Sequence, residues 1–166
     1  MNVKINRGNR RFGLIGLTMA LALVDLTPRA QSQETHTLEG NWNANLSKSR
    51  VHENHQFKSA KMKFKISDKV VSVTYSGVNM AGKEESGTRE VYPDGKEYPV
   101  TEAPGVVQIA KWESSRVLKV LAKKDGSVIG ESTYEVSSDD KTLTATIKGI
   151  DAKGRPFEQI IVFDRE

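Results

Sequence analysis

Alternation of apolar and polar residues with a period of two constrains the fold of this chain more than any other feature. Residues 61–66 alternate three lysines with Met62, Phe64 and Ile66, and residues 142–147 alternate threonines with apolar residues. Adjacent residues of a strand point to opposite sides, so each stretch has one apolar and one polar face. Strands of this kind are typical of antiparallel sheets that cover a single core.

Turn-forming residues, such as Pro93-Asp94-Gly95 and Asp125-Gly126, separate these stretches at short, fairly even intervals. We expect strands near residues 38–46, 61–67, 70–77, 87–92, 96–100, 105–113, 116–123, 127–136, 142–149 and 156–164. Residues 47–58 lack alternation and fit a surface loop, with a one-turn helix or a lid as alternatives. A meander of eight to ten strands in a small domain tends to close into a barrel, because closure removes exposed edges. The prediction is therefore an all-β, single antiparallel up-and-down barrel, with a two-sheet sandwich as the alternative.

The N-terminus has the pattern of a secretory signal peptide. Residues 1–11 carry four basic residues and no acid, and an uncharged, mostly apolar run follows over residues 12–24. A membrane span needs about 20 apolar residues, and Asp25 ends this run too early. Ala30 and Ser32 are the small residues that a signal peptidase reads, so we expect a signal peptide over 1–32 and a domain over 33–166. An uncleaved anchor is the alternative. The expected location is periplasmic or secreted, with no membrane span after processing.

Composition narrows the function. The chain has 25 Lys and Arg, 21 Asp and Glu, and no Cys, which excludes disulfides and thiolate chemistry. Residues 1–32 hold five of the basic residues and one of the acidic residues, so residues 33–166 carry twenty of each. The domain is therefore neutral, and nucleic acid is not an expected partner.

A family resemblance is carried by Gly40-Asn41-Trp42 on the first strand and by Arg165 on the last. This Gly-x-Trp and terminal Arg resemble the lipocalin-type (calycin) signature. The pattern over residues 38–166 is similar to small exported bacterial proteins described as lipocalin-like. The resemblance implies that Trp42 seals the closed end of the barrel and that Arg165 packs across it. The chain departs from lipocalins in having no Cys, no clear second motif and no helix after the last strand.

Residues that could support catalysis or bind a metal are few. His52 and His55 are three residues apart, which is one short of the His-Glu-x-x-His zinc signature. Solvated loop residues explain the pair better than a metal site does. No Ser lies in a Gly-x-Ser-x-Gly motif. We expect no enzyme, no cofactor and no metal.

The predicted function is binding of a small apolar or amphipathic ligand inside the barrel. The residues expected to line the interior are Trp42, Phe64, Tyr75, Leu118, Ile147, Phe157 and Phe163. The same side chains could instead fill a solid core, and the sequence leaves this open. The alternative is a non-enzymatic protein–protein interaction or inhibitor module of the cell envelope. Self-association would use residues 117–122 and 160–163, which are apolar on both faces.

Overall fold

The structure, a computed structural model, describes residues 36–151 and 153–166. The predicted signal peptide over 1–32 lies outside the described residues. Ten strands lie within them: β1 (Gly40–Ala44), β2 (Phe57–Ile66), β3 (Val71–Asn79), β4 (Glu84–Val91), β5 (Asp94–Pro99), β6 (Val106–Ser114), β7 (Val117–Lys124), β8 (Ser127–Val136), β9 (Thr142–Ile150) and β10 (Pro156–Arg165). The all-β prediction is confirmed. The largest difference is β2, which begins four residues before its expected start.

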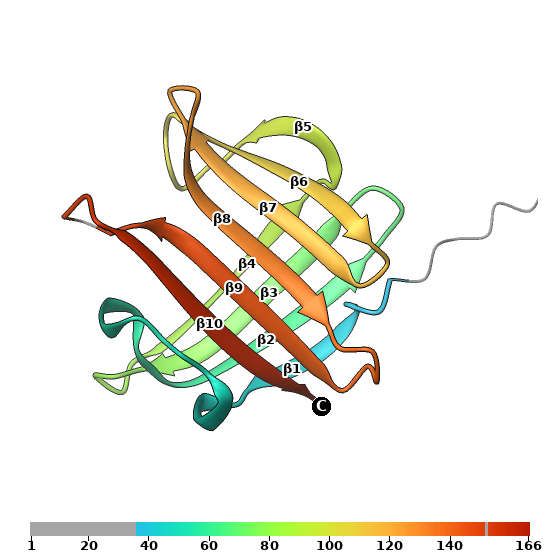
Figure 1. The fold of residues 1–166 in the computed structure, drawn as a ribbon, viewed down its shortest axis with the longest axis vertical. Coiled ribbons are helices and arrows are strands. Elements are labelled where there is room, and N and C mark those ends of the chain that lie inside the picture. Colours follow the sequence, from blue (N-terminus) through green and yellow to red (C-terminus); the bar gives the residue numbers. More distant parts are fainter. Residues whose placement is uncertain (1–35, 152) are drawn as a thin grey trace, which may run out of the picture. The chain divides into compact units, whose positions relative to one another are not determined.

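The strands form one antiparallel sheet in the order β4-β3-β2-β1-β10-β9-β8-β7-β6-β5. All neighbours are consecutive in the chain except β1 and β10, which pair through Trp42–Arg165, Asn43–Asp164 and Ala44–Phe163. The sheet is an up-and-down meander that curls round so that β4 approaches the strands at its other edge (Figure 1). This confirms the predicted up-and-down barrel architecture.

The ladder is open at one seam, where full closure was expected. Within the described residues, β4 and β5 are the two edge strands and do not pair with each other. Pro93 lies in their connection and has no N–H to donate to a ladder. One side chain bridges the gap: Gln108 on β6 donates from Nε2 to the backbone oxygen of Glu90 on β4, at 2.8 Å.

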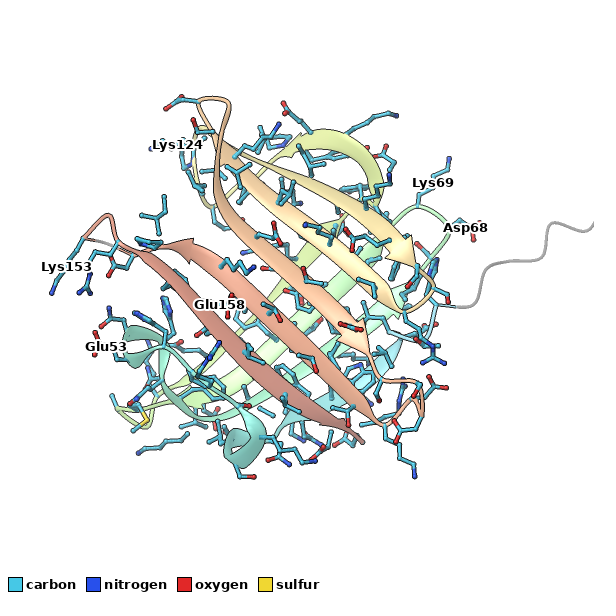
Figure 2. The ribbon with its side chains drawn as sticks, viewed as in Figure 1. Glu53, Asp68, Lys69, Lys124, Lys153 and Glu158 are labelled. Atoms are coloured by element: carbon cyan, nitrogen blue, oxygen red, sulfur yellow. The ribbon has the colours of Figure 1, made fainter. Side chains whose placement is uncertain are left out.

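The two ends of the curled sheet differ in how they are packed. At one end, which we call the closed end, lie the turns β2–β3, β6–β7 and β8–β9, and at the open end lie β3–β4, β7–β8 and β9–β10. Asp68 and Lys69 mark the closed end, and Lys124, Lys153 and Glu53 mark the open end (Figure 2). Buried apolar side chains of the described residues include Leu38, Trp42, Phe64, Val71, Val91, Leu118, Val136, Leu143 and Phe163. Phe64 on β2 and Tyr134 on β8 meet edge to face at 5.4 Å, so side chains from opposite walls touch inside.

The segment between β1 and β2 runs beside β10. It contains two one-turn 3-10 helices, η1 (Leu46–Lys48) and η2 (Glu53–His55). The amide of Asn45 donates to Val162, and Arg50 pairs with Ile160 through two backbone hydrogen bonds. This segment thus continues the pairing of β10 beyond β1 and carries η2 to the open end. None of the described helices is long and apolar enough to cross a membrane.

Candidate ligand site on the inner face of the sheet

The closed end is organised around Trp42. Its side chain is completely buried, and its indole N–H donates to the backbone oxygen of Leu38 at 3.0 Å. Arg165 is its backbone partner on β10, and the guanidinium carbon lies 4.1 Å from the centre of the indole ring. A cation over an indole face is attracted by the ring quadrupole. This is the arrangement that the lipocalin-type resemblance implies for the two residues.

The guanidinium of Arg165 also joins three parts of the chain. Nε donates to Asp140 in the β8–β9 turn at 2.5 Å, Nη1 to Glu39 at 2.9 Å and Nη2 to Thr37 at 2.6 Å, in each case to a backbone oxygen. The planar fork suits several acceptors at fixed angles, which a lysine ammonium could not match. Arg165 therefore fastens the residues before β1 to the closed end.

Gly40 shows why glycine precedes the tryptophan. Its φ is +133°, a region that other residues rarely adopt, and a Cβ built there would lie 2.9 Å from Nη1 of Arg165. Both the backbone angle and the nearby guanidinium thus require a residue without a side chain. This close approach explains the glycine of the Gly-x-Trp motif.

Four of the predicted interior residues belong to the packed core of the closed end. Trp42, Phe64, Leu118 and Phe163 are each at most 2% exposed. Aromatic and aliphatic side chains buried to this degree stabilise the fold by about 1.5–3 kcal/mol each, with or without a ligand. They therefore form the floor beneath any ligand, and Phe64 also meets Tyr134 from the opposite wall.

The other three predicted residues, Tyr75, Ile147 and Phe157, lie towards the open end on the same face. Tyr75 pairs with Met62, the partner of Trp42, so the register places its side chain inside; it is nevertheless 48% exposed. Ile147 and Phe157 are partly buried. The inner face is therefore filled at the closed end and accessible to solvent at Tyr75.

Two glycines on the inner face, Gly87 and Gly149, make room for aromatic rings of neighbouring strands. A Cβ on Gly87 would lie 2.5 Å from the hydroxyl of Tyr75, its cross-strand partner, and one on Gly149 would lie 2.9 Å from the ring of Phe157. Each ring thus lies flat over the neighbouring strand. Bulkier residues at these glycines would push the rings away from the wall.

The sequence missed the polar side chains of the inner face. Gln108 and Gln159 are each 7% exposed, and Oε1 of Gln159 accepts from the amide of His52 at 3.4 Å. Burial raises the pKa of Tyr134 above its ordinary value, and this is opposed by a hydrogen bond from Ser132 and by the charge of Arg89. Residues 84–90 are polar on both faces apart from Gly87, so alternation could not show that Arg89 faces inward.

The histidine pair lies beside the open end. The rings of His52 and His55 are 5.0 Å and 4.8 Å from that of Phe157, and 5.5 Å from each other. Among the described residues, no group of three or more His, Cys, Asp or Glu is placed to hold a metal ion. The pair therefore packs η2 against the first residues of β10.

A shallow groove lies on the opposite, outer face of β1–β3. Its volume is about 200 Å³, and its outward side chains include Asn41, Asn43, Lys61, Lys63, Thr74, Ser76 and Glu166. Lys61 and Glu166 form an ion pair at 3.2 Å. Trp42 and Met62 also line the groove, which is shallow and open to solvent. The inner face holds the larger set of aromatic side chains and is the better candidate site.

Comparison with solved structures gives the class of fold. A mutant of the fluorescent protein UnaG is 13% identical, with a TM-score of 0.55 over 78% of this chain and 96% of the other. A Schistosoma mansoni fatty acid binding protein, solved with arachidonic acid, is 13% identical, with a TM-score of 0.54 over 81% and 99%. This protein has a calycin-type fold. No sequence-family model matches the chain, and no curated protein sequence matches it.

Proposed function

We propose that this protein binds a small apolar or amphipathic molecule against the inner face at the open end. The observation that carries the proposal is Tyr75, whose side chain faces inward by register and is still 48% exposed. Tyr75, Ile147 and Phe157 offer apolar surface there, above the packed closed end. Each 100 Å² of ligand and wall surface removed from water would contribute about 2.5 kcal/mol to binding.

The fold supports this function. The Schistosoma mansoni protein of similar fold carries a fatty acid in its solved structure. At 13% identity the likeness shows the fold alone, so the ligand class proposed for this chain depends on its own inner-face residues. Apolar walls with a few polar groups are the usual lining of a small-molecule site.

Titration with N-phenyl-1-naphthylamine, an uncharged fluorescent probe, tests the proposal. Gly130 faces inward on β8, and a Cβ there would meet its nearest neighbour at 3.5 Å, an ordinary contact, so a side chain can be attached that points into the proposed ligand space. Gly130→Phe should weaken probe binding about tenfold or more by occupying that space. The matched control is Thr133→Phe, which places the same ring on the outer face of the same strand. Absence of binding, or equal effects of the two variants, would contradict the proposal.

We also propose that the protein is exported. The proposal is supported by the basic residues 1–11, the apolar run 12–24 and the small residues Ala30 and Ser32. Expression of the chain with a C-terminal tag, followed by fractionation and N-terminal sequencing, tests it. The mature protein should begin close to Gln33 and leave the cytoplasm. An intact Met1 on cytoplasmic protein would contradict export.

The alternative, a protein–protein module, is favoured by the unpaired edges of β4 and β5, which another strand could join. Opposing it, β4 carries Glu84, Glu85, Arg89 and Glu90 over eight residues, and such charges protect an edge from pairing. We therefore place ligand binding first. A stable dimer in light scattering, together with no probe binding, would reverse the order.

A further inference from the structure

Arg89 is a cation on the inner wall. It lies on β4 opposite Val73, which is 7% exposed and belongs to the apolar core, so the register directs the Arg89 side chain to the same inner face. Arg89 is itself exposed. A charged group thus lies next to the core and remains accessible.

The charge of Arg89 is not neutralised by the surrounding protein. Among the described residues, its guanidinium forms no hydrogen bond or ion pair. Glu85, the nearest acid on the same face of β4, accepts a hydrogen bond from Asn79 at 2.8 Å. Arg165, the other inward arginine, is fully engaged at the closed end. Because Arg89 is exposed, its charge stays hydrated and is free to pair with an anion from solution.

Tyr134 supplies a second polar group from the opposite wall. The ring of Tyr134 meets the ring of Phe64 at a centroid distance of 5.4 Å. Phe64 on β2 and Arg89 on β4 are the two backbone partners of Val73 on β3, so Phe64, Val73 and Arg89 lie in one row across the sheet. Tyr134 interacts electrostatically with Arg89 and accepts a hydrogen bond from Ser132. The phenol proton therefore remains available to donate to a ligand.

We propose that Arg89 and Tyr134 bind the anionic head of an amphipathic ligand, a carboxylate or phosphate carried on an apolar body. The inference rests on the proposed function and names the ligand class for the same inner face. The apolar body would extend from Arg89 towards Tyr75, Ile147 and Phe157 at the open end. The guanidinium would donate two N–H bonds to the head, and the phenol would donate a third.

Competition against bound N-phenyl-1-naphthylamine tests this inference, with dodecanoate and dodecyl phosphate as anions and dodecanol as the uncharged analogue. Because charge-assisted hydrogen bonds are lost, Arg89→Met should weaken both anions about 10- to 100-fold. It should leave dodecanol within about twofold, since the apolar contacts remain. Arg89→Lys should recover part of the loss, and Tyr134→Phe should weaken the anions by about 3- to 10-fold.

Lys63→Met is the matched control, because it removes the same charge from the outer face of β2, beside Phe64. Lys63→Met should leave the affinities for the two anions and for dodecanol unchanged. Equal loss of dodecanoate and dodecanol in Arg89→Met would assign Arg89 a structural role and overturn the inference, and so would an unchanged affinity for the anions. Both results would leave the proposed function intact. Failure of the wild-type protein to bind the uncharged probe would overturn the proposed function and this inference together.

Discussion

The closed and open ends use the same strands and similar residues for different purposes. At the closed end, Trp42 is covered by Arg165, and the guanidinium is bound to three backbone oxygens. Towards the open end, in the middle of β3, Tyr75 lies over Gly87 and remains 48% exposed. One end therefore supplies stability, and the other keeps apolar surface free. The comparison teaches that register decides which face a residue occupies, and the side chains around it decide whether it is packed.

Truncation of Trp42 and of Tyr75 to alanine should show the largest difference in stability between the packed and the accessible regions. Trp42→Ala should destabilise the fold by about 3–5 kcal/mol, because it leaves a large cavity in a packed region. Tyr75→Ala should cost about 1 kcal/mol or less, because much of the ring is already in water. Urea denaturation measures both free energies of unfolding. Equal losses would contradict the division into a packed and an accessible end.

Replacement of an arginine at each end comes next. Arg165→Met should cost about 2–3 kcal/mol, because three hydrogen bonds and the contact with the indole are lost. Arg155→Met removes an ion pair at 2.8 Å between the half-exposed Arg155 and Asp151, which is 4% exposed. The amides of Lys153 and Arg155 still donate to the carboxylate, so the loss should be about 1 kcal/mol. Thermal unfolding of the two variants, scanned side by side, measures the difference. A larger loss for Arg155→Met would show that the open end is the better fastened.

Gly40 and Gly126 both have positive φ, and alanine substitutions at the two positions distinguish the cost of backbone strain from the cost of a close contact. Gly40→Ala should cost about 2 kcal/mol, because the methyl group meets the Arg165 guanidinium in addition to the strain. Gly126, in the β7–β8 turn, has φ +77° and no heavy atom within 4 Å of a built Cβ. Gly126→Ala should therefore cost about 1 kcal/mol, from the backbone angle alone. Chemical denaturation of both gives the difference, and equal costs would remove the role given to the guanidinium.

Lowering the pH should have a smaller effect on the free energy of unfolding than these substitutions. The pKa of Asp151 in the β9–β10 turn lies below its ordinary value, chiefly because the amide of Arg155 donates to it. A carboxyl group with a lowered pKa in the folded protein stabilises it above about pH 4, and this contribution is lost as pH falls through the folded-state pKa. Asp151→Asn should therefore show a smaller loss of stability between about pH 5 and pH 2, measured by the urea midpoint. An unchanged pH profile would contradict this assignment.

The strands could be predicted from the sequence because their signal is local. Alternation in residues 61–66 and 142–147 fixes which side chains share a face, and turns such as Asp125-Gly126 mark the ends. The start of β2 was placed too late because residues 57–60 do not alternate clearly. They become a strand by pairing with the end of β3, through Phe57–Asn79 and Ala60–Gly77.

The candidate site could be predicted only in part. The register places Phe64 and Tyr75 on one face, but alternation does not show that one is buried and the other exposed. Arg89 carries no local signal of facing inward. It follows from the pairing of β3 with β4, which sets Arg89 opposite Val73.

The sequence by itself determined the all-β class, the up-and-down order and the residues that face inward on most strands, because these depend on alternation and turns along the chain. The tertiary structure decided where the ladder stays open, which end is packed, and which polar groups meet inside. These features depend on strand register and on contacts between walls, such as Phe64 with Tyr134. Such contacts join residues far apart in the chain, and no local pattern encodes them.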